Sequence, residues 1–162
     1  MQIINSPIDK NFKTSLRTDI YAPLNLATIA GFIKDSALEG KVEILDGEMQ
    51  SWEMLLMKIN APIVGISCNL MTYKSALEIA EYAYNKGSKV ILGGPFATSM
   101  PEKILINRSY IDAVVTGDGE KALLEYVQGK DYNTIPNLVF RDGKNIVRNR
   151  TEKTDISTLP FP

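Results

Sequence analysis

Glycines and short polar side chains follow three apolar segments of this sequence, and they are the residues best suited to bind a ligand. Glycine lets a large or flat group approach the backbone, and a short hydroxyl side chain can form a hydrogen bond with it. We therefore predict a binding surface where these segments meet. The three segments are Ser67-Cys68-Asn69-Leu70-Met71-Thr72, Gly93-Gly94-Pro95-Phe96-Ala97-Thr98 and Gly117-Asp118-Gly119-Glu120.

Each segment also has a purely structural interpretation. Gly-Gly-Pro after a strand is typical of a tight turn, and the acidic residues Asp118 and Glu120 can complement the N-terminus of a following helix. The interpretation as a binding surface depends on the position of the segments. It requires that they end neighbouring strands at one edge of a sheet.

The side chains needed for most catalysis are missing. The sequence contains no histidine, so it cannot form a Ser-His or Cys-His nucleophile pair. Its single cysteine, Cys68, excludes an internal disulfide and any multi-cysteine metal or iron–sulfur site formed by these residues alone. We expect Cys68 to be a small buried residue. We assign no residue a catalytic or metal-binding role.

Composition limits the partners and the compartment. With 18 Lys+Arg and 19 Asp+Glu the net charge is -1, which leaves no broad basic surface for nucleic-acid phosphates. No apolar run approaches the roughly 18 residues of a spanning helix, and the first residues lack the pattern of a signal peptide. We expect neither nucleic acid nor membrane as a partner. A cytoplasmic location fits the single cysteine.

Segments rich in β-branched residues alternate with helix-length segments of 3.6-residue periodicity, a pattern typical of βαβ units. The predicted strands are 2–7, 42–46, 63–67, 89–92 and 113–116. The predicted helices are 23 to about 40, 51–59, 73–86, 101–107, and one from the 117–120 segment to about 128. Residues 137–140 and 146–148 are predicted to form a hairpin, because Asp142-Gly143 is a strong hairpin signal.

These elements predict an α/β fold with a doubly wound, five-stranded parallel sheet. The flavodoxin-like, or Rossmann-like, strand order 2-1-3-4-5 with a small C-terminal β-hairpin fits best. In this fold ligands bind where the winding reverses, beside the first and third strands. The loop 8–23 and the three segments named above are expected at that edge.

Other small-ligand folds fit less well. Neither the G-x-G-x-x-G dinucleotide fingerprint nor the G-x-x-x-x-G-K-[ST] phosphate loop is present. A phosphoacceptor receiver domain needs an aspartate after the third strand, where this sequence has Ser67-Cys68-Asn69. A free-standing flavodoxin-like binder of another nucleotide would need phosphate-holding loops that we do not find.

Several stretches together resemble the cobalamin-binding domain that precedes the radical-SAM domain in B12-dependent radical-SAM enzymes. Their order and spacing carry the resemblance, which covers nearly the whole chain. The family often has Pro-Leu-Gly-Leu, Gly-Gly-Pro-His-Ala-Thr and Gly-Glu-Gly-Glu at three of them. The stretches are Ala22-Pro23-Leu24-Asn25-Leu26, Val42–Asp46, Val64-Gly65-Ile66-Ser67 with Thr72, Val90–Thr98, Asp112–Glu120, Ile135–Gly143 and Leu159-Pro160-Phe161-Pro162.

The resemblance implies a division of the chain and a cofactor. Residues 1–130 would be the cobalamin-binding domain, 131–150 a hairpin extension, and 151–162 a linker toward a catalytic domain. The resemblance implies that the parent protein is a methyltransferase. Its radical-SAM domain, the other expected partner, would hold a [4Fe-4S] cluster and S-adenosylmethionine. This chain contains no C-x-x-x-C-x-x-C motif for such a cluster.

The resemblance also implies where cobalamin binds. The corrin would lie over the strand ends, and its nucleotide tail would enter a groove between the first, third and fourth strands. Because the D-x-H-x-x-G motif needs a histidine, the cofactor would bind base-off with no protein histidine on cobalt. The implied binding residues are Ser67, Asn69, Leu70, Thr72, Gly93, Gly94, Pro95, Phe96, Gly117, Asp118, Gly119 and Glu120.

Two residues depart from the family pattern. Phe96 stands where histidine is common, and Asn25 stands where glycine is usual in the first helical turn. A phenylalanine at position 96 could fill the pocket. The alternative hypothesis is therefore a B12-like domain that has lost cofactor binding and acts as an interaction or substrate-shaping module.

Overall fold

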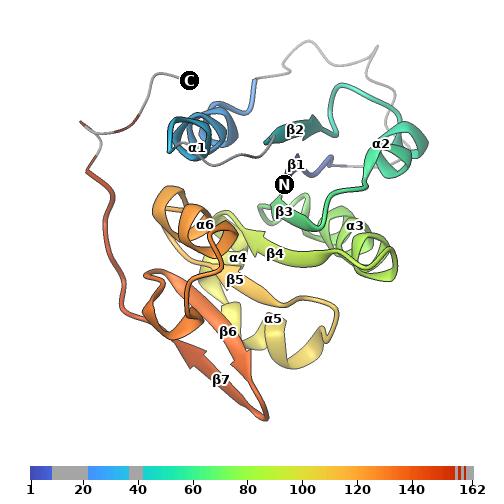
Figure 1. The fold of residues 1–162 in the computed structure, drawn as a ribbon. Helices are drawn as coiled ribbons and strands as arrows, with labels where there is room; N and C mark the ends of the chain where they lie inside the picture. Colours follow the sequence, from blue (N-terminus) through green and yellow to red (C-terminus); the bar gives the residue numbers. More distant parts are fainter. Residues whose placement is uncertain (9–21, 37–41, 156, 158, 160–162) are drawn as a thin grey trace.

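The computed structural model describes residues 1–8, 22–36, 42–155, 157 and 159, and its described strands form one sheet (Figure 1). The strand order is β2-β1-β3-β4-β5-β6-β7, so the predicted order 2-1-3-4-5 is confirmed for the parallel part. The strands are β1 (Gln2–Asn5), β2 (Glu43–Asp46), β3 (Ile63–Ser67), β4 (Lys89–Gly93), β5 (Ala113–Val115), β6 (Leu138–Asp142) and β7 (Asn145–Arg148). Most of the predicted loop 8–23 lies outside the described residues.

Helices cover both faces of the sheet. On one face α1 (Leu24–Asp35) and α6 (Glu120–Val127) lie against it (Figure 1). On the other face α2 (Trp52–Lys58), α3 (Tyr73–Asn85) and α5 (Pro101–Asn107) pack on residues such as Ile4, Val64 and Leu92. The strands are rich in apolar residues because their side chains are buried against helices on both faces of the sheet.

The C-terminal hairpin extends the same sheet. β6 pairs antiparallel with β5, and β7 pairs antiparallel with β6 across the two-residue turn Gly143-Lys144. Arg141 Nη2 donates a hydrogen bond to the carbonyl of Leu105, 2.8 Å away near the end of α5. The hairpin is therefore held both by strand pairing and by a cap on a neighbouring helix.

Two short elements were not predicted. Residues 93–98 were expected to be a strand-end loop, but Pro95–Ser99 forms the short helix α4. Proline at the first helical position is favourable because its missing N–H would have had no helical partner there. A short 3₁₀ helix, Tyr132–Thr134, was also missed.

Gly94 makes the turn from β4 into α4 possible. Its φ is +92°, and a Cβ atom placed there would lie 2.5 Å from the carbonyl oxygen and 2.9 Å from the amide nitrogen of Cys68. No side chain fits against that backbone. Gly94 therefore lets the end of β4 lie directly on the residue that follows β3.

Cys68 itself is a core residue. It is 2% exposed, and its amide donates to the carbonyl of Gly93 over 3.0 Å. Burial raises the pKa of the Cys68 thiol to about 11, and a backbone hydrogen bond from Ala97 opposes the rise. The thiol is therefore protonated and shielded at neutral pH, which agrees with its predicted structural role.

We predict that Gly94→Ala destabilises the fold far more than Gly87→Ala. Gly87 has nearly the same φ, +88°, but no atom lies within 4 Å of the Cβ position. Alanine at 87 should cost about 1 kcal/mol of backbone strain, whereas alanine at 94 adds a steric clash and should cost about 3 kcal/mol or more. Urea unfolding of the two variants measures both values, and equal losses would contradict the proposed close contact with Cys68.

We also predict a pH dependence from Cys68. Between about pH 9 and pH 11 the unfolded thiol loses its proton while the folded thiol keeps it, so the free energy of unfolding should fall as pH rises through this window. Below pH 9 this group should contribute no slope. Unfolding titrations of the wild type and Cys68→Ala at several pH values test this, since only the wild type should show the contribution. Rapid alkylation of the folded protein at pH 8 would contradict the burial.

Candidate functional site

A groove opens on the sheet face that carries α1 and α6. Strand register places Ile3, Gly65 and Ile91 side by side in its floor. The next inward-facing row contains Ser67 beside Gly93. Gly65 and Gly93 contribute only backbone to the middle of this floor, and Ile3 and Ile91 flank Gly65.

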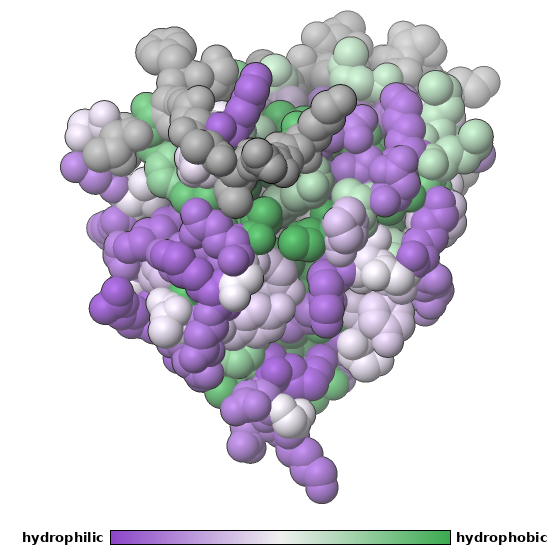
Figure 2. All heavy atoms as spheres, in the orientation of Figure 1, coloured by the Kyte–Doolittle hydropathy of each residue, from purple (hydrophilic) through white to green (hydrophobic). Residues whose placement is uncertain are grey.

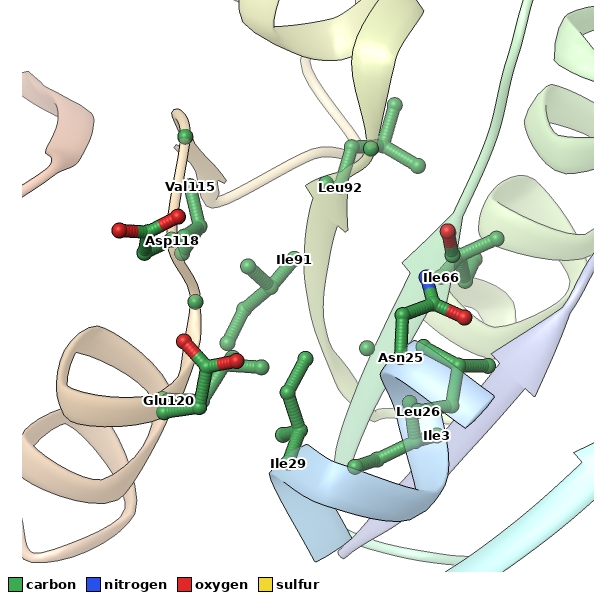
Figure 3. Close-up of a pocket in the computed structure, with 17 residues that line it drawn as sticks. Ile3, Asn25, Leu26, Ile29, Ile66, Ile91, Leu92, Val115, Asp118 and Glu120 are labelled. Atoms are coloured by element: carbon green, nitrogen blue, oxygen red, sulfur yellow. The ribbon is translucent and has the colours of Figure 1, made fainter. Parts of the chain in front are cut away.

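The walls come from the two helices and from the loop before α6. α1 contributes Asn25, Leu26 and Ile29, and Ile29 points toward Ile91 across the groove (Figure 3). On the opposite side Glu120 and Leu123 of α6 complete the wall. Figure 2 shows hydrophobic surface near the middle of this face, with hydrophilic side chains on either side.

The groove is small. Its volume is about 210 Å³, below the roughly 300–1,000 Å³ that encloses a whole drug-sized ligand. It can therefore take one planar ring system of a ligand and leave the remainder over the strand ends.

The two floor glycines differ from Gly94 in what surrounds them. A Cβ atom on Gly93 would meet only the carbonyl oxygen of Val115, at 3.8 Å, so the space above Gly93 is open. On Gly65 the nearest atom would be the flexible end of Met1, at 3.2 Å. Gly93 is thus not required by the packing of the protein, and its missing side chain leaves room for a ligand.

Two polar side chains of the groove are free to bond a ligand. Within the part of the chain that the structure describes, neither the amide of Asn25 nor the hydroxyl of Ser67 has a hydrogen-bond partner. The carbonyl of Ser67, by contrast, accepts a hydrogen bond from Ser6 Oγ over 2.7 Å. An amide and a hydroxyl can each donate to a ring nitrogen or accept from a ligand amide.

The acidic residues at the rim already have partners. The Thr154 amide donates to Asp118 Oδ2 over 2.9 Å, and the Thr154 hydroxyl lies 3.4 Å from Glu120 Oε2. No lysine or arginine is among the described residues that line the groove. The carboxylates of Asp118 and Glu120 in this lining suit a hydrogen-bond-donating group.

The structure brings some of the predicted site residues together and not others. Ser67, Gly93, Gly94 and the segment Gly117 to Glu120 line the groove. The remaining predicted residues lie outside its lining, although they are near the same edge of the sheet. These are Asn69, Leu70, Thr72, Pro95 and Phe96.

Two of those outer residues build the loop before α3. Asn69 Oδ1 accepts hydrogen bonds from the amides of Met71 and Thr72, at 2.8 and 3.0 Å, and Thr72 Oγ1 accepts from the amide of Asn69 at 3.0 Å. Their polar groups shape the loop. Leu70 is left 73% exposed by this arrangement, at the carboxyl edge of β3.

Phe96 does not line the groove. Its ring lies 4.3 Å from that of Tyr73, centroid to centroid, on the sheet face opposite α1 and α6. Burial raises the pKa of Tyr73 above its ordinary value, and nearby Arg108 opposes the rise. Phe96 therefore belongs to an aromatic contact between α3 and α4.

Sequence reasoning missed the contribution of α1 and of the strand interiors. Ile3, Asn25, Ile29, Gly65 and Ile91 line the groove but were not predicted as site residues. One signal was available, because glycine inside a buried central strand often marks a close approach of another group. Gly65 is such a residue.

The described residues contain no group of three or more His, Cys, Asp or Glu side chains that could hold a metal ion. Nor does any helix among them have the length and apolar character needed to cross a membrane.

Comparisons with curated proteins connect the chain to methyltransferases. It is 29% identical over 154 residues to an uncharacterized methyltransferase of Pyrococcus horikoshii, covering 86% of this chain and 33% of the relative. It is 24% identical over 151 residues to an uncharacterized methyltransferase of Synechocystis, covering 90% of this chain and 24% of the relative. The chain thus spans about a third or less of the length of these relatives.

The fold has solved counterparts. One is the radical S-adenosylmethionine methyltransferase TsrM from Kitasatospora setae, solved with cobalamin and a [4Fe-4S] cluster bound. The TM-score is 0.72 at 20% identity, covering 98% of this chain and 30% of that one. Another is the N-terminal domain of a hypothetical protein from Thermotoga maritima, with a TM-score of 0.51 at 24% identity, covering 74% of this chain and 92% of that one.

A family model covers most of the sheet and both walls of the groove. The model described as B12 binding domain matches residues 15–127, which include the strands β2 to β5 and the helices α1 and α6. This match spans well over half of the chain. The chain therefore belongs to the B12 binding domain family.

Proposed function

We propose that this chain is the cobalamin-binding module of a B12-dependent radical-SAM enzyme of the methyltransferase class. The observation that carries the proposal is the open space above Gly93 in the floor of an apolar groove. The family match supplies the class of ligand. The shape of the groove explains how its lining residues could accommodate that ligand.

The groove suits the nucleotide tail of the cofactor. The planar base of the tail would lie over Gly65 and Gly93, between Ile29 and Ile91. Apolar side chains on both sides of a flat ring bury its surface, and bare backbone lets it approach. Ser67 and Asn25, whose polar groups have no partner among the described residues, would bond its nitrogen and oxygen atoms.

The corrin would lie over the carboxyl ends of the strands. Leu70 and Met71 expose apolar side chains there, 73% and 66% of each being accessible, and Gly117 and Asp118 lie across the same edge. A ring system too large for the groove needs such a surface. The predicted residues outside the groove lining, Asn69, Leu70 and Thr72, keep a proposed role at this edge.

We propose base-off binding. A tail whose base occupies the groove cannot also bind cobalt, and the sequence has no histidine to replace it. Bound cobalamin supplies a cobalt centre able to carry a methyl group, and the ligand on its lower face tunes that chemistry. This chain's own residues hold the cofactor and orient it.

The rest of the proposed activity belongs to a longer protein. The chain spans 30% of the TsrM chain and 33% of the Pyrococcus relative. We propose that a radical-SAM domain with a [4Fe-4S] cluster and S-adenosylmethionine is its partner in the parent protein, which would act in the cytoplasm. We also propose the predicted division into residues 1–130, 131–150 and 151–162.

The alternative of a domain that has lost cofactor binding has no structural observation in its favour. It depended on Phe96 filling the pocket, and the Phe96 ring packs on Tyr73 outside the groove lining. The alternative remains one outcome of the binding experiment below.

We predict that the chain binds hydroxocobalamin and gives a base-off visible spectrum. Gel filtration after mixing, with absorbance recorded on the protein peak, measures both properties. Cobinamide, which lacks the nucleotide tail, serves as the control. Its affinity should be lower by at least about tenfold, because it leaves the groove empty. A protein peak without corrin absorbance would overturn the proposal in favour of the alternative. A base-on spectrum would overturn the placement of the tail.

We further predict that Gly93→Val blocks the tail without unfolding the protein. The valine side chain would enter the open space above residue 93, and valine suits a strand. The affinity for cobalamin should fall at least about tenfold, while cobinamide binding should change little. Unchanged cobalamin affinity in a folded variant would show that the tail lies elsewhere.

Two serine variants provide a matched comparison. Ser67→Ala removes a hydroxyl that faces the groove, and Ser88→Ala removes one that donates to the carbonyl of Ala61 at the opposite edge of the sheet. We expect Ser67→Ala to weaken cobalamin binding about fivefold, the value of one hydrogen bond of about 1 kcal/mol. Ser88→Ala should lower stability only. Isothermal titration and urea unfolding separate the two effects, and equal affinities would contradict the role of Ser67.

A further inference from the structure

Asn137 lies outside the groove but connects three segments of the chain. It is 3% exposed and adopts φ +62°, a left-handed conformation that is uncommon outside glycine. Its carbonyl accepts from the Thr116 amide at 2.8 Å and from the Thr116 hydroxyl at 3.1 Å. Its backbone is thus joined to the residue that follows β5.

The side chain of Asn137 joins the groove rim to a later segment. Its Nδ2 donates to the carbonyl of Asp118 over 2.9 Å and to the carbonyl of Glu152 over 2.8 Å. Its Oδ1 accepts from the amide of Glu152 over 2.8 Å. Both N–H donors and one acceptor site of a buried amide are therefore used, which leaves this residue little freedom to move.

The later segment, residues 150–154, also holds the rim directly. Its Thr154 amide donates to the Asp118 carboxylate, and Glu152 forms an ion pair with Lys121 in the first turn of α6. We call residues 150–154 the strap. The strap bonds to Asp118 and Glu120 of the rim, and the rim residues Gly117 to Glu120 all line the groove.

We infer that Asn137 is a positioning residue for ligand binding. It holds the strap against the rim residues 117–120 and so fixes the conformation of the rim. This inference rests on the proposed function for its ligand. Asn137 is not among the residues that line the groove, so it acts through Asp118 and its neighbours. Because linkage is reciprocal, a ligand that orders the rim must also favour the docked strap.

The test compares Asn137→Gly with Asn149→Ala in the full chain. Glycine keeps the left-handed backbone conformation accessible and removes the amide. Asn149 also donates to two carbonyls, those of Tyr132 and Ile135, but it does not contact the rim. The two variants therefore remove similar hydrogen bonds at different places.

Amide hydrogen exchange gives a readout that needs no ligand. The amides of Gly117 and Thr154 bond to Thr98 and Asp118, so neither touches Asn137. In Asn137→Gly both should exchange about tenfold faster, because the rim and the strap loosen together. In Asn149→Ala both should exchange as in the wild type. Unchanged exchange of these two amides in Asn137→Gly would overturn the inference.

Binding gives the second readout. Asn137→Gly should raise the Kd for hydroxocobalamin about tenfold, whereas Asn149→Ala should leave it within about twofold even if its thermal stability falls. Hydroxocobalamin should also slow exchange at Thr154 in the wild type. Wild-type protein that fails to bind cobalamin would overturn the proposed function, while the ligand-free exchange would still decide the role of Asn137. Equal Kd values for Asn137→Gly and the wild type would overturn the inference alone.

Discussion

The contact between Gly94 and the backbone of Cys68 is the constraint on which the carboxyl edge of this sheet depends. It brings the end of β4 against the residue after β3, where the Cys68 amide bonds to the carbonyl of Gly93. From that turn α4 begins at once and leads away to the face opposite α1 and α6. The floor at Ser67 and Gly93 is left uncovered as a result. The groove exists because the chain departs to the other side.

The positions of many strands and helices could be predicted because local patterns in this sequence are strong. Ile63 to Ser67 is a short apolar strand, and its predicted bounds match β3. The helix predicted over 51–59 corresponds to α2, whose N-cap Ser51 accepts a hydrogen bond from the amide of Met54. Such signals depend on a few neighbouring residues, so they can be recognised without a structure.

The walls of the groove could not be predicted in the same way. Ile29 and Ile91 have the ordinary pattern of core residues, and only the pairing of strands from distant parts of the sequence shows that a space remains between them. The sequence also did not show that the side chains of Thr72 and Asn69 hydrogen-bond to each other's backbone, so that they shape the loop before α3. The neighbouring glycines Gly93 and Gly94 likewise have different structural roles. Gly94 is required by its own backbone, whereas Gly93 is not.

The two walls of the groove are far apart in the sequence, since α1 begins at Leu24 and α6 at Glu120. Contacts between residues so far apart in sequence form late, because closing a long chain segment costs entropy before the contacts form. A partly folded chain that has made only its central strands has a floor without walls. A cofactor that binds between them therefore recognises the completed fold, and its binding free energy adds to the stability of the whole domain rather than of one element. Cofactor supply would in this way act on how long the folded domain survives, as well as on the chemistry that it serves.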